Sequence, residues 1–210
     1  MTPSQTEIEK ALVDVRTAYR LLHDYQRAAL DAAKYIGTQL SFDYRGGYQG
    51  FTDNSSPKPG KGHLSLSSWD WLNLVFYDFH FTRRLGSTDL NLLIRLFSDT
   101  GYFISDDPSP DKTVVSTFAP VELSRTMVGF LFYMEWKPEY DGFLNARDDV
   151  RRFLETGSEL PVAFKKGGVV GKCCSFSRIS DEASTDVVVA ELVQMAKANG
   201  FQLTRLNKGS

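Results

Sequence analysis

The sequence has few of the residues from which metal, redox and nucleophilic sites are commonly built. It contains two cysteines in 210 residues, and they are neighbours, Cys173 and Cys174. Because a disulfide between adjacent cysteines is badly strained, we expect free thiols and a reducing, cytoplasmic compartment. The pair lacks the C-x-x-C spacing of zinc ribbons and thioredoxin-like proteins, and on a strand the two thiols would point to opposite faces, so that at most one is buried. Only three histidines are available as zinc ligands.

Long apolar segments and an excess of basic charge are absent as well. No run approaches the roughly 18 apolar residues of a transmembrane helix, and the opening MTPSQTEIEK lacks the basic and apolar regions of a signal peptide. The formal net charge is −2, so no general positive field favours nucleic-acid phosphates. We therefore expect a soluble intracellular protein without a membrane segment, for which nucleic acid is not the favoured partner.

The sequence does have apolar bulk. Hydrophobic residues make up 42% of the chain and aromatic residues 13%, enough for one domain over residues 1–210 with a bulky core. Residues 41–63 are rich in Gly, Pro and Ser and have no sustained period, which predicts a long loop with a short strand around Tyr44. Nothing before this loop could fold alone, so it lies inside the domain and does not mark a boundary.

The first forty residues carry the clearest pattern. Ser4 with Glu7, and Thr6 with Glu9, have the spacing of a capping box at the start of a helix. Two series, each repeating every seven residues, then form a seam along one helical face, with Gln26 its only polar member: Ile8, Val15, Leu22, Ala29 and Ile36, and Leu12, Tyr19, Gln26 and Ala33. The pattern predicts a helix over residues 6–36, ended by Gly37, with its latter half buried.

Such a helix is long for its domain. It would extend roughly 45 Å, whereas a compact domain of this size has a radius of gyration of about 17 Å. The helix therefore spans the domain, breaks midway, or projects its first turns toward a partner. The narrow first part of the seam, with Ile8, Leu12 and Val15, fits a protein partner or a second copy of the chain in a homodimer. Packing of the whole helix on the chain's own sheet is the simpler expectation.

The rest of the chain alternates between strand and helix patterns. Strands are predicted over residues 74–81, 90–96, 102–105, 114–118, 126–136 and 201–206, with a hairpin of 162–165 and 169–179 around Gly167-Gly168. The segment 126–136 is apolar on both faces and should be a central strand. Helices are predicted over 143–154, ended by Gly157, and from Ser184 or Thr185 to Asn199-Gly200. The fold class is therefore α+β: a long N-terminal helix packed on a mostly antiparallel sheet of about six or seven strands, with two further helices.

One short motif points to catalysis. Glu135 and Lys137 lie on one face of the strand end Glu135-Trp136-Lys137. With an acidic residue at an earlier strand end, for which Asp99 is the first candidate and Asp78 the second, the pattern resembles the PD-(D/E)xK nucleases. The resemblance implies two carboxylates that bind Mg²⁺ and a lysine that supports an attacking water. It covers only these positions, no Pro precedes Asp99, and a predicted strand intervenes before Glu135, so a surface charge pair is the favoured alternative.

Asp78 and His80 form a second candidate pair. They share a strand face and could act as metal ligands or as an acid–base pair. A structural role is the favoured alternative.

The tryptophans mark a candidate recognition surface. Trp69 and Trp71 precede the first strong strand, Trp136 lies near the end of another, and such residues often anchor partners. With weak catalytic signals, the sequence favours a non-catalytic interaction or regulatory protein that binds a protein partner through the N-terminal helix seam or the tryptophan surface. A Mg²⁺-dependent nuclease is the first alternative, and a small-ligand-binding domain with an aromatic pocket between helix and sheet is the second. No cofactor is expected outside the nuclease interpretation.

Overall fold

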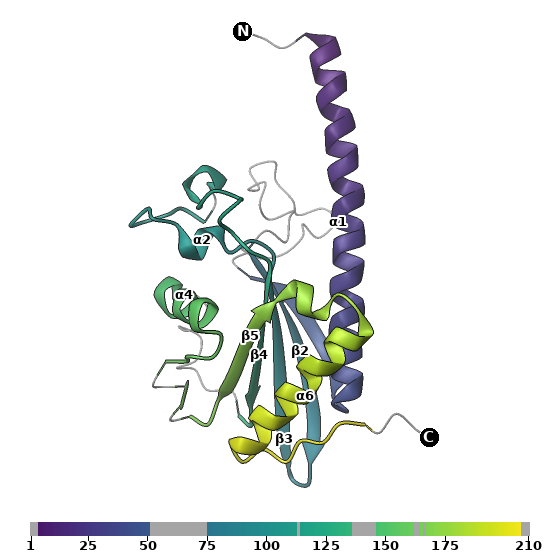
Figure 1. Ribbon diagram of the computed structural model, residues 1–210, viewed down its shortest axis with the longest axis vertical. Coiled ribbons are helices and arrows are strands. Elements are labelled where there is room, and N and C mark those ends of the chain that lie inside the picture. The colour runs from purple at the N-terminus through teal and green to yellow at the C-terminus, as the bar shows by residue number, and fades with distance from the viewer. Residues whose placement is uncertain are drawn as a thin grey trace, which may run out of the picture.

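The computed structural model describes residues 4–50, 75–112, 114–135, 146–161, 164–165 and 167–206, and its fold is α+β (Figure 1). The strands in these ranges are β1 (Asp43–Gln49), β2 (Phe76–Leu85), β3 (Thr88–Phe97), β4 (Met127–Tyr133) and β5 (Val170–Ser175). The α-helices are α1 (Gln5–Gln39), α2 (Gly101–Ile104), α4 (Arg147–Thr156) and α6 (Glu182–Ala198), with short 3₁₀ helices η2 (Val115–Thr117) and η4 (Phe176–Ile179). None of the described helices is both long enough and apolar enough to cross a bilayer.

The five strands form one antiparallel sheet in the order β1-β2-β3-β4-β5. Each strand therefore pairs with the strand next to it in the chain, and a short turn joins β2 to β3, whereas longer segments separate the other pairs. β2 and β3 pair over their full length, from Phe76 opposite Phe97 to Leu85 opposite Thr88. Gly86, at φ +61°, occupies the left-handed position that closes this hairpin.

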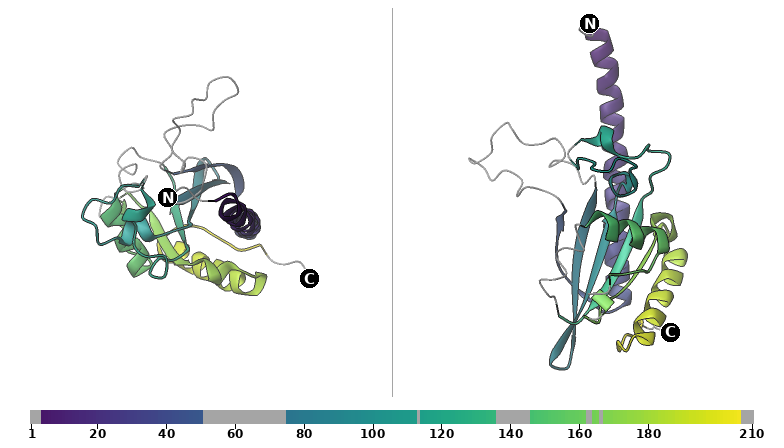
Figure 2. Two further views of the ribbon diagram at one scale, coloured as in Figure 1. Left: turned by 90° about the horizontal axis from the view of Figure 1, so that it is seen from above. Right: turned by 90° about the vertical axis from the view of Figure 1, so that its left-hand side faces the viewer.

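Helices cover both faces of the sheet. α1 and α6 lie on one face and α4 on the other, as the two views in Figure 2 show. Alternate residues of each strand therefore enter two separate cores, for example Phe130 on the α1 side and Leu131 on the α4 side. The segment 126–136 was predicted as a central strand; all seven residues of β4 are buried, and β4 lies between β3 and β5, one place from the middle of the sheet.

α1 begins where the sequence indicates and ends later. The Ser4 hydroxyl accepts a hydrogen bond from the Glu7 backbone N–H, and the Glu7 carboxylate accepts one from the Ser4 N–H, so the first of the two predicted capping boxes forms. The expectation that Gly37 ends the helix is wrong, because α1 continues to Gln39 and Leu40 is its C-cap. Gly37 is buried within the last turns, where a Cβ atom would lie 2.5 Å from the ring of Phe81.

The structure also corrects the predicted number of strands, since the described residues form five and not six or seven. Residues 102–105, predicted as a strand, lie in α2 and just after it, because the Asp99 carboxylate accepts a hydrogen bond from the Gly101 N–H at 2.7 Å and turns the chain. Residues 114–118 hold η2, and 201–206 run without a strand ladder. β5 pairs with β4, and residues 164–165, predicted as part of the other hairpin strand, are helical; residues 162–163 lie outside the described part of the chain.

The remaining two predicted helices are present with small shifts. α4 ends at Gly157, as predicted, in the left-handed conformation at φ +76°. α6 begins earlier than expected, because Asp181 and not Ser184 or Thr185 is the N-cap, and its carboxylate accepts a hydrogen bond from the Ser184 N–H. Two helices were predicted besides α1, and the described residues contain three; α2 is the additional one.

Candidate partner-binding site

α1 extends well beyond the sheet that its second half covers (Figure 1). On the sheet, the seam residues Ala29, Ala33 and Ile36 are buried. Beyond the sheet, the same helical face carries five large apolar residues that are exposed, which we call the free seam: Ile8 (47%), Leu12 (46%), Val15 (45%), Tyr19 (63%) and Leu22 (39%). The expectation that the whole helix packs on the chain's own sheet is therefore wrong for its first half. The projecting first turns are the arrangement that leaves Ile8, Leu12 and Val15 available to a partner.

Tyr25 marks the point where α1 meets the body of the protein. Its ring packs edge-on against Phe176 of η4, with ring centroids 5.5 Å apart, and its hydroxyl donates to the Ser98 hydroxyl at 3.2 Å. Burial raises the pKa of the Tyr25 phenol. Every described residue before Tyr25 is exposed. The body therefore holds α1 from Tyr25 onward and leaves about five turns of helix in solvent.

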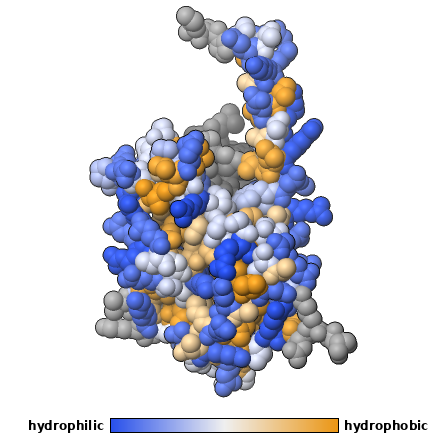
Figure 3. Space-filling model, viewed as in Figure 1, coloured by the Kyte–Doolittle hydropathy of each residue, from blue (hydrophilic) through white to orange (hydrophobic). Residues whose placement is uncertain are grey.

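The exposed part of α1 shows apolar side chains among charged ones in the space-filling view (Figure 3). Val13 and Leu21 are also exposed, with 51% and 66% of their surfaces in solvent, and they lie four residues to either side of Thr17, away from the free seam. Clusters of exposed apolar residues on one element are typical of protein-binding surfaces.

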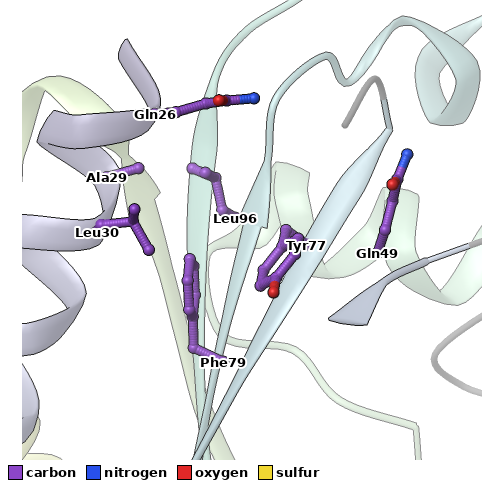
Figure 4. A pocket seen from close by; sticks show the side chains of 7 residues that line it. All are labelled: Gln26, Ala29, Leu30, Gln49, Tyr77, Phe79 and Leu96. Atoms are coloured by element: carbon purple, nitrogen blue, oxygen red, sulfur yellow. The ribbon is translucent and has the colours of Figure 1, made fainter. Parts of the chain in front are cut away.

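A cleft lies where the seam reaches the sheet. α1 contributes Gln26, Ala29 and Leu30, and the sheet contributes Gln49, Tyr77, Phe79 and Leu96, around a volume of about 290 Å³ (Figure 4). Tyr77 and Phe79 also contact each other, with ring centroids 4.7 Å apart. Leu30 and Phe79 also line an adjoining hollow of about 470 Å³ toward β1. We call these two hollows together the helix–sheet cleft.

The opposite face of β2 and β3 carries a buried polar group. Arg95 donates to both oxygens of Asp78, from Nε at 2.7 Å and from Nη2 at 2.6 Å, and its guanidinium lies 3.8 Å from the ring centroid of Phe76. This bidentate pair satisfies the Asp78 carboxylate within the fold, which supports the structural interpretation of Asp78.

His80 lies on the same face, as alternation predicts. Its ring stacks on Tyr48 at 5.2 Å, and its buried Nε2 has no hydrogen-bond partner among the described residues. Burial lowers the pKa of His80; Asp78 opposes this shift and Arg95 adds to it. Burial also raises the pKa of the nearby Tyr133 to about 12.

The structure does not bring the two candidate nuclease acids together. Asp99 lies two residues beyond Phe97, which is opposite Met127, whereas Glu135 lies two residues beyond Tyr133, which is opposite Asn91. Six strand steps, roughly 20 Å, separate these two levels, and both acids lie still further out. Asp99 and Glu135 therefore cannot bind one Mg²⁺ ion in this fold, and Asp99 instead caps the turn into α2.

The structure does not describe four of the candidate site residues. Lys137, Trp69, Trp71 and Trp136 lie outside the described residues. No group of three or more His, Cys, Asp or Glu side chains in the described ranges could hold a metal ion.

The cysteines depart from expectation in one respect. Both Cys173 and Cys174 are buried free thiols, since both faces of the sheet are covered, and the expectation of at most one buried thiol is wrong. Burial raises the pKa of both thiols, so they stay protonated and unreactive near neutral pH.

The architecture defines an α+β protein whose N-terminal helix offers an uncovered apolar face. The chain belongs to the PM0109 family, whose model matches residues 5–204. The match begins at the first residue of α1, so the free seam lies within the length that defines the family. No curated protein and no solved structure matches the chain.

Proposed function

We propose that the protein is a non-catalytic interaction protein that binds a protein partner through the free seam of α1, in a reducing intracellular compartment. One observation carries the proposal. The heptad seam that is buried against the sheet at Ala29, Ala33 and Ile36 continues, with Gln26 as its one polar member, to Ile8, where nothing in the described protein covers it.

The energetics favour a covered state of this helix. Most of the stability of a helix in a protein comes from packing of its apolar face, and every described residue of α1 before Tyr25 is exposed. Burying one large aliphatic side chain contributes about 1.5–3 kcal/mol. A partner that covers the five residues of the free seam would therefore stabilise the segment itself as well as the complex.

The proposal is tested by photo-crosslinking in cells. A benzophenone amino acid replaces Leu12 on the free seam in one variant and Thr17, which lies on the opposite side of α1, in a matched control. We expect one discrete crosslinked product from position 12 and little from position 17. Equal yields from both positions, or none from position 12, would contradict the proposal.

A second candidate function rests on the helix–sheet cleft. Its lining is in large part aromatic and aliphatic, and Asp31, Lys34 and Asp43 add charged groups in the hollow toward β1, as in sites for small apolar ligands that carry polar groups. A naphthalene-sulfonate dye serves as the probe. We expect Leu30→Trp, which fills the cleft, to weaken dye binding, and Leu22→Trp on the free seam to leave it unchanged.

A further inference from the structure

We propose that the partner of the free seam is a second copy of this chain, bound antiparallel. The inference rests on the proposed function, that this seam binds a protein, and it names the occupant and its orientation. Three properties of α1 carry it: the heptad register, the position of the sheet, and the charges beside the seam.

The spacing of the seam fixes a coiled-coil register. Steps of four and three residues from Ile8 to Leu12 to Val15 assign Leu12 and Tyr19 to a positions and Ile8, Val15 and Leu22 to d positions. The residues that flank the seam then follow from the heptad: the e positions hold Glu9, Arg16 and His23, and the g positions hold Ala11, Ala18 and Tyr25.

The sheet excludes a parallel arrangement. In a parallel dimer the helix of the second copy would continue along the seam past Tyr25. The sheet of the second copy would then lie at the same height along the helix axis as the sheet of the first copy. There the seam face of α1 is already packed against the sheet, with Ala29 and Ile36 buried. An antiparallel second helix ends at the level of Leu22, so the two bodies lie at opposite ends of a shared segment of 18 residues, roughly 27 Å long.

The charges select one antiparallel register. When Leu12 of one copy is opposite Val15 of the second copy, Ile8 is opposite Tyr19 and Gln5 is opposite Leu22. The e positions then bring Glu9 of each copy beside Arg16 of the second copy, which gives two symmetrical ion pairs. The register one heptad further along brings Arg16 beside Arg16 and is disfavoured.

The other flank is compatible with the same register. At the g positions Ala11 of one copy faces Ala18 of the second copy. These small side chains allow the two helices to approach closely and introduce no charge of like sign. The seam can therefore bury its apolar residues from both copies at once.

The charge pairs give a direct test by sedimentation velocity. We expect the wild type to double its 23.6 kDa mass with increasing concentration. Glu9→Arg and Arg16→Glu should each raise the dimer dissociation constant by roughly tenfold, because each replaces two attractive pairs with two repulsive ones. A mixture of the two variants should form a heterodimer, since every Arg then faces a Glu. Asp14→Arg and Lys10→Glu, which make the same charge changes on the outer side of α1, are the matched controls and should dimerise like the wild type.

Spin-label distances test the orientation independently. Cysteines introduced at Asp14 and Asp24, both exposed and away from the seam, carry the labels, and the unmodified chain with its two buried cysteines is the labelling control. In the antiparallel dimer the two Asp14 labels lie at nearly the same level, whereas the two Asp24 labels are about 30 Å apart along the helices. Similar short distances at both positions would overturn the antiparallel arrangement.

The outcomes separate the inference from the proposed function. A wild type that stays monomeric at several hundred micromolar, together with a crosslink from position 12 to a different protein, would overturn self-pairing and leave the proposed function supported. A monomer with no crosslink from position 12 would overturn both. A dimer that ignores the Glu9 and Arg16 reversals would overturn the register on which the inference depends.

Discussion

Gly37 sets the distance between α1 and β2 because it has no side chain. A Cβ atom there would lie 2.5 Å and 2.8 Å from two ring atoms of Phe81, which is itself buried. Alanine is intrinsically the better helix former, by about 1 kcal/mol. We nevertheless expect Gly37→Ala to lower the free energy of unfolding by about 1–3 kcal/mol, measured by urea denaturation, because overpacking outweighs propensity. A double-mutant cycle with Phe81→Leu should show the two changes to be coupled; additive effects would contradict the contact.

Removing one partner of the Asp78–Arg95 pair should lower the free energy of unfolding more than replacing both partners with apolar residues. Both side chains are almost fully buried, and each neutralises the other. Asp78→Ala leaves a buried guanidinium without its counter-charge, so we expect a loss of about 3–5 kcal/mol in the free energy of unfolding. The double variant Asp78→Leu with Arg95→Met should lose less than the single variant. A larger loss in the double variant would indicate that Arg95 has a further role on this face of the sheet.

His80 makes stability depend on pH. Burial lowers its pKa in the folded protein, so the unfolded chain binds a proton more readily, and protonation favours unfolding. The contribution of His80 is therefore fully present above its unfolded pKa of about 6.5 and is lost as the pH falls below that value. We expect the free energy of unfolding of the wild type to fall between pH 7.5 and 5.5, and that of His80→Gln to fall less.

The exposed His23 supplies the control for this titration. Its side chain is 72% exposed on the free part of α1. His23→Gln, the same substitution at an exposed position, is the matched control variant. An equal reduction in slope for both variants would mean that the buried environment of His80 is not the cause.

At the scale of elements, α1 and α6 have the same type of N-terminal cap, but loss of the cap should affect the stability of the whole protein only in α6. Ser4 and Asp181 each accept a hydrogen bond from the backbone N–H three residues on, at 3.3 Å and 2.9 Å. α6 packs on the core through Val188 and Leu192, whereas the first turns of α1 contact nothing in the described body. We expect Asp181→Ala to lower the urea midpoint of the whole protein and Ser4→Ala only to speed amide exchange in the first turn of α1. A lower midpoint for Ser4→Ala would show that the start of α1 is coupled to the core.

Periodicity and end signals predicted most helices and interior strands. The seven-residue repeat gave α1, and Gly157 gave the end of α4. The strand prediction for Tyr102–Ser105 failed because the high β-propensity of Tyr, Phe and Ile was outweighed by the local turn at Asp99. The candidate metal site at Asp99 and Glu135 failed for a different reason. Its geometry depends on strand direction in the sheet, which the sequence alone does not specify.

At the scale of the whole molecule, α1 belongs to two environments. From Tyr25 onward it is part of the α1 side of the core, and before Tyr25 it is a helix in solvent. The sequence identified the seam residues, including Ile8, Leu12 and Val15, because the seam has one period throughout. It could not indicate where the sheet ends beneath the seam, since that depends on the lengths and register of β1 to β3. The cleft beside Leu30 was foreseen only as an aromatic pocket between helix and sheet, without its residues.

This division predicts that the free part of α1 can be removed without loss of the fold. A chain that lacks residues 1–22 keeps Tyr25 and its contacts with Phe176 and Ser98, and it keeps every seam residue that the sheet covers. We expect its free energy of unfolding, from urea denaturation at low protein concentration, to lie within about 0.5 kcal/mol of the full chain. Its amide protection from residue 25 onward should also match. At high concentration the full chain alone should gain protection over residues 8–22, because only there can a partner cover the seam. A strongly destabilised shortened chain would show that the first turns of α1 support the core directly.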